Sequence, residues 1–145
     1  MESPQALRGL VRGLHHVAIA TPDLEASRKL YVDVMGMSPA QDEPEHVPGQ
    51  GVHVFVVHAG SQRIELVEPT GPETPVAKFL ASRGPGIHHM AWEVDDLEAA
   101  LAELKDKGVR LVHETPQAGS HNTRIALLHP SATGGVLMEL VQDPH

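Results

Sequence analysis

The sequence predicts an α+β fold made of two tandem modules, each with the element order βαβββ, in a single domain of 145 residues. The first observation is an internal repeat: an apolar strand pattern carries two adjacent histidines and is followed by an aspartate and a helix start. The pair His15-His16 recurs as His88-His89, so the second histidines are 89 − 16 = 73 residues apart. A strand and helix start repeated at this spacing indicates a duplicated module.

A second repeated segment closes each module. The apolar strand around Glu65 recurs around Glu139, at a separation of 139 − 65 = 74 residues. Since the two separations agree within one residue, we place module 1 at about residues 14–84 and module 2 at about residues 85–143. The strands of each module leave a sheet edge that needs cover, so we expect the two modules to close side by side.

The composition is that of a globular protein and argues against several partners. Hydrophobic residues make up 41% and charged residues 21% of the chain, which are ordinary values. A net charge of −8 argues against nucleic acid, whose binding depends on neutralising phosphates. No apolar run approaches the roughly 18–20 residues of a membrane span, and no cysteine is present for a disulfide or a thiolate zinc site. Residues 1–13 lack the apolar block of a secretory signal, so we expect a cytoplasmic protein.

Module 1 begins with a predicted strand over residues 14–20, in which alternation places His16 on one face and His15 on the other. Asp23 is the expected N-cap of a helix that ends near Gly36. The other elements follow from turn residues, helix-start signals and β-branched runs. They are a lead-in over residues 1–13, a loop or hairpin turn over 41–50, strands over 51–58 and 63–67, and a helix over 75–81 that Thr74 and Pro75 begin.

Module 2 begins with a predicted strand over residues 87–94, and Asp95-Asp96 then caps a helix over residues 97–107. Gly108 is the expected end of this helix. Its inward-facing residues are Leu97, Leu101 and Leu104. The remaining expected elements are strands over 109–112, 124–128 and 136–141, a loop over 115–122 and a turn over 130–135.

Four polar residues occupy equivalent strand positions of the two modules: His16 and Glu65 in the first, and His89 and Glu139 in the second. A single strand histidine or glutamate is more often a packed or solvated residue, and the repeat is what favours a shared role. Two histidine nitrogens and two carboxylates in one cleft suit a divalent ion such as Zn²⁺, Co²⁺, Ni²⁺, Mn²⁺ or Fe²⁺. Two further positions on such an ion would be open to a substrate.

His15 and His88 repeat in the same way as the predicted ligands. Alternation sends both to the opposite strand face, so we expect them to be structural residues and not ligands. A register shift of one residue would exchange the roles within each pair.

Several segments between about residues 14 and 142 carry a resemblance to a known family. They are residues 15–20 (HHVAIA), 50–52 (QGV), 64–69 (IELVEP), 74–80 (TPVAKFL), 86–92 (GIHHMAW), 128–130 (LHP) and 134–140 (GGVLMEL). Together with the paired modules, these segments resemble the vicinal oxygen chelate (glyoxalase) superfamily and, within it, the methylmalonyl-CoA epimerase family. The narrower resemblance depends on the VAKFL segment and on the HP and GGVL segments.

The resemblance implies one curved mixed sheet around a metal cleft and an isomerase that interconverts the C2 epimers of methylmalonyl-CoA. The C2 proton would be removed to give a metal-stabilised enolate and returned on the opposite face. The family's ligand positions match His16, Glu65, His89 and Glu139, and we expect Glu139 and Glu65 also to transfer the proton. The resemblance further implies Co²⁺ as the favoured ion, with Zn²⁺, Ni²⁺ and Mn²⁺ as alternatives, an acyl-CoA substrate, propionate metabolism and a homodimer.

One position departs from the family pattern. In several members a glutamate follows Gln-Gly-Val-x and is assigned as a proton-transfer base, whereas residues 50–53 here are followed by Val54. Because valine cannot move a proton, the role falls to the ligand glutamates, which we favour, or to a neighbouring side chain. His53 alternates to the other face, and Glu43 and Glu45 are expected in the preceding loop.

Three further positions have both a functional and a structural interpretation. His121-Asn122, in a glycine-containing loop, could cover the substrate or be a surface turn. Lys78 and Arg124 could contact the acyl-CoA, although solvated surface charge is the commoner role of such residues.

Other activities of the same fold are alternatives. One is a glyoxalase I-type lyase acting on a glutathione hemithioacetal. A second is an extradiol dioxygenase, whose site usually holds Fe²⁺ with two histidines and one carboxylate and whose single-chain forms are larger. A third is a non-catalytic binding protein of the bleomycin-resistance type, against which the four intact ligand positions argue.

Overall fold

The computed structural model describes residues 10–144, and most of the lead-in predicted for residues 1–13 lies outside them. The chain divides into two compact units, each described by itself. The first unit consists of residues 16–89, and the second contains residues 10–15 and 90–144. Among the described residues, no helix has both the length and the apolar character needed to span a membrane.

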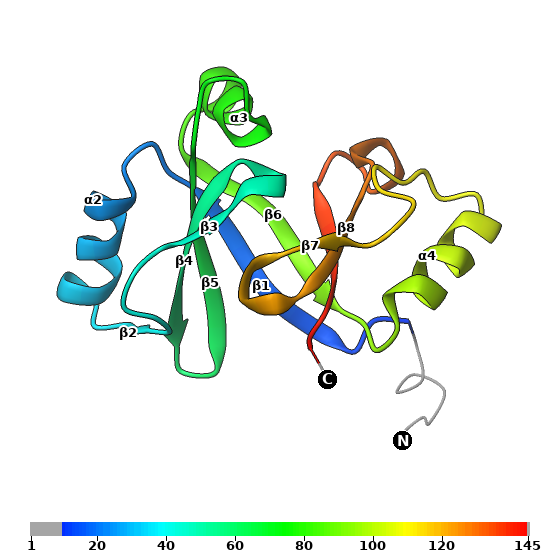
Figure 1. Ribbon diagram of the computed structural model, residues 1–145, viewed down its shortest axis with the longest axis horizontal. Helices are drawn as coiled ribbons and strands as arrows, with labels where there is room; N and C mark the ends of the chain where they lie inside the picture. The colour runs from blue at the N-terminus through cyan, green and yellow to red at the C-terminus, as the bar shows by residue number, and fades with distance from the viewer. Residues whose placement is uncertain (1–9, 145) are drawn as a thin grey trace. The chain divides into compact units, whose positions relative to one another are not determined.

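The first unit has a mixed sheet whose long hairpin consists of β4 (Val52–Ala59) and β5 (Gln62–Pro69) (Figure 1). β5 pairs in parallel with β1 (Gly13–Ala20). β4 pairs antiparallel with two short strands, β2 (Ser38–Pro39) and β3 (Glu45–Val47). The sheet therefore combines parallel and antiparallel pairings, with one strand more than the predicted βαβββ order because both β2 and β3 pair with β4.

Helices pack on both faces of this sheet. α2 (Leu24–Arg28), which continues as a π-helical turn over Lys29–Val34, packs on the face that carries Phe55. α3 (Pro75–Arg83) packs on the face that carries Val54. Successive side chains alternate along β4, which separates an α2 face from an α3 face. The α3 face buries Ala20, Val47, Val52, Val54, Val56, Val67 and Val76.

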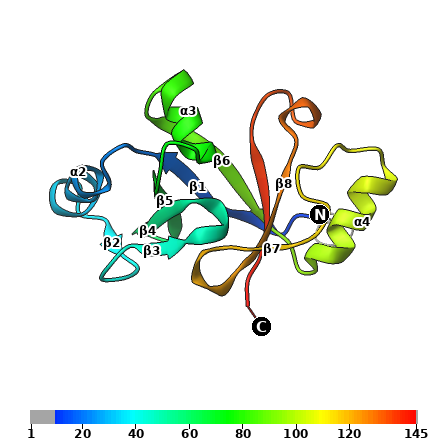
Figure 2. The ribbon, with the colours of Figure 1, turned by 45° about the horizontal axis from the view of Figure 1, so that its top comes forward.

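The second unit has a mixed sheet in the order β6-β9-β8-β7. β6 (Gly86–Glu93) pairs in parallel with β9 (Met138–Gln142), and β9 pairs antiparallel with β8 (Arg124–Leu128). β7 (Gln117–Ala118) extends this sheet along β8. α4 (Leu97–Asp106) packs against it (Figure 2). The buried residues shared between α4 and the sheet include Leu97, Leu101, Ala126, Leu128 and Leu140.

The internal repeat extends to the strand pairing of each unit. Glu65 lies opposite Ala18 on its parallel neighbour, and Glu139 lies opposite Ala91. The alanines are 91 − 18 = 73 residues apart and the glutamates 139 − 65 = 74, the separations found in the sequence. Each glutamate also pairs with an antiparallel strand, β4 in the first unit and β8 in the second. The two glutamates therefore occupy the same position in equivalent three-strand arrangements.

The same equivalence holds where α2 and α4 begin. The side chains of Asp23 and Asp96 each accept a hydrogen bond from the backbone N–H three residues on, at 3.1 and 3.0 Å. The side chains of Glu68 in β5 and Gln142 in β9 accept from the first helical N–H, at 2.8 and 2.7 Å. Each closing strand thus holds the start of its module's first helix.

Most of the expected elements are confirmed. The predicted strands over residues 14–20, 51–58, 63–67, 87–94 and 124–128 correspond to β1, β4, β5, β6 and β8. Thr74 is the N-cap of α3 as expected, although the helix continues to Arg83. α4 ends one residue before the predicted end, with Leu97 and Leu101 buried.

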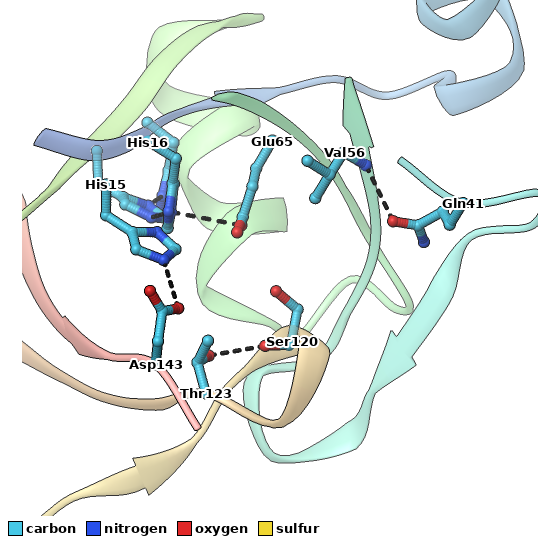
Figure 3. A network of polar contacts seen from close by, with 10 residues as sticks. His15, His16, Gln41, Val56, Glu65, Ser120, Thr123 and Asp143 are labelled. Carbon is cyan, nitrogen blue, oxygen red and sulfur yellow. Dashed lines mark hydrogen bonds and ion pairs between the residues drawn. The ribbon is translucent and has the colours of Figure 1, made fainter. Parts of the chain in front are cut away.

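The expectation of a loop over residues 41–50 is wrong in part. This segment contains β3 and a 3₁₀ turn at Pro48–Gln50. Between β2 and β3, the side chain of Gln41 bonds the edge of β4 as a strand would (Figure 3). Its Nε2 donates to the Val54 carbonyl at 3.1 Å, and its Oε1 accepts from the Val56 N–H at 3.3 Å. A segment without the alternating pattern of a strand can therefore join the sheet, because the edge of β4 is available to pair with it.

In module 2, one predicted strand is nearly absent and the last strand begins later than predicted. The strand predicted over residues 109–112 is reduced to one bridge between Leu111 and Leu128. A short strand outside the prediction, β7, pairs with the other end of β8. The last strand begins at Met138 and not at residue 136, after Gly134 and Gly135, whose φ angles of 74° and 98° prolong the turn. Short 3₁₀ turns also occupy Ser120–Asn122 and Pro130–Ala132.

Candidate metal centre

Three of the four predicted ligands meet inside the first unit. His16 of β1, Glu65 of β5 and His89 of β6 are 2%, 7% and 7% exposed. Buried polar groups of this kind require a partner, since desolvating them without one is costly. Strand pairing explains the proximity of two of them, because Glu65 lies opposite Ala18, two residues along β1 from His16.

The distances within this group fit ligation of one ion. His16 Nε2 lies 3.2 Å from His89 Nε2 and 3.5 Å from Glu65 Oε1, and Figure 3 shows the His16–Glu65 contact. Two nitrogens about 2.1 Å from one ion are about 3.0 Å apart at a right angle and about 3.4 Å apart at the tetrahedral angle. The observed nitrogen separation lies between these values, and a set of two imidazoles and a carboxylate suits a divalent ion.

His88 supports the orientation of His89. The Nδ1 atoms of the two rings are 2.9 Å apart, and the His88 ring also packs edge-on against Phe79, with centroids 4.9 Å apart. Burial, reinforced by the neighbouring His89, lowers the pKa of His88 to about 4, so its imidazole is neutral at pH 7. A neutral His88 can accept a hydrogen bond from His89 Nδ1–H, which directs the lone pair of His89 Nε2 towards His16. Alternation along β6 did not predict this contact between adjacent rings.

The fourth predicted ligand, Glu139, lies in the second unit. Its side chain is 4% exposed on β9. One neighbour of this carboxylate, His113, was not predicted from the sequence. Burial lowers the pKa of His113, and the charge of Glu139 opposes this by raising it. His113 Nδ1 accepts the Leu127 N–H at 3.1 Å. The repeat could not reveal His113, because the equivalent position, 113 − 73 = 40, is Ala40.

His15 also belongs to the second unit and has a different partner from His16. Its Nε2 lies 2.8 Å from Asp143 Oδ1, and its side chain is only 5% exposed (Figure 3). This contact gives the first histidine of the pair a structural interaction of its own.

The candidate substrate-contact residues lie on α3, on β8 and in the loop between β7 and β8. Lys78 is exposed on α3, and Arg124 bonds Glu98 through Nη1 and Oε1 at 3.1 Å. His121 and Asn122 adopt left-handed φ angles of 55° and 60°, uncommon for residues other than glycine. Within the same loop, Thr123 Oγ1 donates to the carbonyl of the buried Ser120 at 2.7 Å (Figure 3).

The chain belongs to the Glyoxalase/Bleomycin resistance protein/Dioxygenase superfamily, whose family model matches residues 15–127. Within this superfamily, the chain is similar to methylmalonyl-CoA epimerases. It is 42% identical over 89% of its length to the mitochondrial methylmalonyl-CoA epimerase of Bos taurus, of which it covers 73%. It is 39% identical over 92% of its length to the ethylmalonyl-CoA/methylmalonyl-CoA epimerase of Cereibacter sphaeroides, of which it covers 99%.

Solved structures agree with this assignment. The methylmalonyl-CoA epimerase of Mycobacterium tuberculosis matches with a TM-score of 0.90 at 38% identity, covering 100% of this chain and 94% of that one. A methylmalonyl-CoA epimerase in complex with methylmalonyl-CoA and NH4+ matches with a TM-score of 0.85 at 35% identity, covering 93% and 96%. The predicted fold class, that of the vicinal oxygen chelate superfamily, is confirmed.

Proposed function

We propose that the chain interconverts the two C2 epimers of methylmalonyl-CoA and is therefore an isomerase. The observation that carries this proposal is a buried group of His16, Glu65 and His89 in a chain 42% identical to a methylmalonyl-CoA epimerase. The acyl-CoA substrate is supported by the similar structure that contains methylmalonyl-CoA. Because one similar protein is named for ethylmalonyl-CoA as well, the substrate class extends to 2-alkylmalonyl-CoA thioesters.

The site chemistry suits this reaction. The C2 proton of such a substrate lies between a thioester and a carboxylate, and its removal places negative charge on the thioester oxygen. A divalent ion, when bound, would supply Lewis-acid stabilisation of that charge. The chain must provide ligands for the ion, an apolar enclosure for the acyl group and groups that remove and return the proton on opposite faces.

The proposed ligands are His16, Glu65, His89 and Glu139. The first three lie close together in the first unit, and Glu139 is the buried repeat-equivalent of Glu65. The nitrogen and oxygen donors suit a divalent ion. The family resemblance makes Co²⁺ our first choice, with Zn²⁺, Ni²⁺ and Mn²⁺ as alternatives. As expected from the sequence, Glu139 is also proposed to transfer a proton, and the assembly is proposed to be a homodimer, which light scattering of the purified protein would test.

The activity is tested by incubating the metal-loaded protein with one epimer of methylmalonyl-CoA in deuterated water. Deuterium should enter C2, the second epimer should form, and both changes should stop after chelation and resume when the ion is restored. A matched sample with a glutathione hemithioacetal tests the glyoxalase I-type lyase. Turnover of the hemithioacetal without exchange at C2 would replace the proposal by the lyase. Acyl-CoA binding without exchange or turnover would replace it by a non-catalytic binding protein.

The ligand set is tested separately by measuring bound metal in the Glu139→Ala variant. Metal content should fall while the far-ultraviolet circular dichroism spectrum is retained. A variant with unchanged metal content would exclude Glu139 as a ligand. The Glu139→Gln variant tests proton transfer, and full exchange activity in that variant would remove Glu139 from this role.

A further inference from the structure

The proposed epimerisation requires a proton-transfer group on each face of C2, and the structure points to a carboxylate that the sequence analysis placed in a loop. The Oε1 atom of Glu65 lies 3.5 Å from His16 Nε2 within the proposed ligand group, so a carboxylate outside that group is sought as the partner of Glu139. Val54, two residues along β4 from the partner of Glu65, has no proton to exchange. A different side chain is therefore needed beside this part of the sheet.

Strand register places Glu45 there. Glu45 of β3 lies opposite Val54 of β4, and Val56 of β4 lies opposite Glu65 of β5. Val54 and Val56 are two residues apart on one strand, so both point to the same face. Residues directly opposite in antiparallel strands also share a face, with Cβ atoms about 4.5–5.5 Å apart. Glu45 therefore lies on the α3 face, the face of Glu65.

The strand register also sets the spacing between Glu45 and Glu65. Glu45 and Glu65 are separated by two strand spacings and one two-residue step, which is about 12 Å between Cα atoms on a flat sheet. A carbon between them would be within reach of Glu45 while its neighbouring oxygens approach the ligand group.

The sheet face beside Glu45 is apolar. Val54, Val56 and Val67 are 3%, 2% and 4% exposed and form the floor of the α3 face, and Glu45 is half-buried at the edge of this floor. An apolar floor favours proton abstraction at carbon, because it strengthens the electrostatic interactions that stabilise the negative charge that forms.

The other ionisable side chains of the described β3, β4 and β5 are less suitable. On the α3 face they are Glu65 and a pair at the hairpin end, His58 opposite Arg63. His58 is four residues along β4 from Val54, about 14 Å away. On the α2 face, Glu68 accepts the first N–H of α2 at 2.8 Å, and His53 lies opposite both Glu68 and His46. The α2 face cannot supply a group to the floor of the α3 face.

We propose that Glu45 is the proton-transfer residue on one face of C2; this inference rests on the proposed epimerase function. As the C2–H bond breaks, its proton forms an O–H bond to the Glu45 carboxylate and its electron pair delocalises into the thioester carbonyl. A second group, Glu139 in the proposal above, returns a proton to the opposite face of C2. The reverse reaction exchanges the two roles, and proton exchange with solvent restores both carboxyl groups.

The test compares the metal-loaded Glu45→Gln variant with the wild type, using each pure epimer in deuterated water. Glutamine keeps the size of the side chain and removes its ability to hold the proton. Epimerisation should fall by about 10²–10⁴-fold, the usual contribution of a general base. One epimer should lose C2 exchange, whereas the other should still incorporate deuterium with retention of configuration, because the remaining group acts on its face. A purely structural role for Glu45 would not produce this asymmetry.

Two further variants serve as controls. Glu43→Gln makes the same charge change at an exposed neighbouring position and should leave both exchange rates unchanged. Val54→Glu, introduced into the Glu45→Gln protein, returns a carboxylate to the position directly opposite and should restore part of the lost exchange.

The inference is overturned if Glu45→Gln exchanges both epimers at the wild-type rate. It is also overturned if that variant loses bound metal in proportion to its activity, since Glu45 would then act through the ion. If the wild type exchanges neither epimer, the proposed function itself fails and this inference falls with it. The C2 exchange activity of the wild type therefore distinguishes a failure of the proposed function from a failure of the Glu45 assignment.

Discussion

His89→Ala should abolish the stabilisation of this protein by divalent metal. The Nε2 atoms of His16 and His89 are 3.2 Å apart and both side chains are buried, so an ion between them would gain two preformed ligands. Removing one leaves the other imidazole beside a carboxylate without the geometry that holds the ion. The folded state, and not the unfolded chain, presents this arrangement, so metal binding must raise the stability of the fold.

The size of the effect follows from binding linkage. Free ion at 100 times its Kd stabilises the fold by about 2.7 kcal/mol. For a chain of 145 residues, each kcal/mol corresponds to about 3–4 °C in Tm, so the wild type should gain about 8–11 °C. The Tm of His89→Ala should rise by less than about 2 °C under the same conditions. The stabilisation depends on the logarithm of one plus the ratio of free ion to Kd, and this is near zero when binding is weak.

Thermal melts with and without Co²⁺, followed by circular dichroism, measure these gains, and elemental analysis gives the bound metal per chain. His53→Ala is the matched control, because its side chain is 41% exposed and lies on the α2 face. That variant should retain the full gain. A His89→Ala protein that kept the wild-type gain and metal content would refute the assignment of His89 as a ligand.

Three other perturbations test the fold around the site. Gly119→Ala should lower the free energy of unfolding by about 1–3 kcal/mol, since a Cβ there would lie 2.5 Å from a threonine oxygen. Gly71→Ala is the control, because a Cβ at that position meets nothing within 4 Å. Denaturant titration compares the two variants. Glu68→Ala should cost about 1.5–3 kcal/mol in the same titration, because the N–H of the buried Leu24 loses its charged acceptor. His88 has a pKa lowered from 6.5 to about 4, so the unfolded metal-free chain binds the extra proton between these values. Stability should therefore fall as pH drops through that window, by at most about 1.4 kcal/mol per pH unit from this residue, and His88→Gln should flatten the slope of stability against pH.

The sequence alone was sufficient to name the candidate ligands. His16 and His89 could be paired because a duplication preserves spacing, and the strand pattern around each is a local property of adjacent residues. The same reasoning applied to Glu65 and Glu139. The structure then shows these two glutamates at the same register in their respective sheets. Helix starts such as Asp96 were predictable for the same reason, since a cap contacts only the next turn of its own chain.

The sequence could not determine the strand register between segments that are distant in the chain. The same holds for segments that have no hydrophobic periodicity of their own. Residues 41–50 carry no alternating pattern, yet the free edge of β4 recruits Glu45 into a strand directly opposite Val54. His113 is held near Glu139 by its hydrogen bond to β8. Its repeat-equivalent is Ala40, so the duplication gives no sign of a polar residue at this position. Such pairings depend on which strand edge is left exposed after the rest of the sheet has formed. Tertiary structure therefore decided which carboxylate stands beside Val54, whereas the repeat had already identified the four candidate ligands.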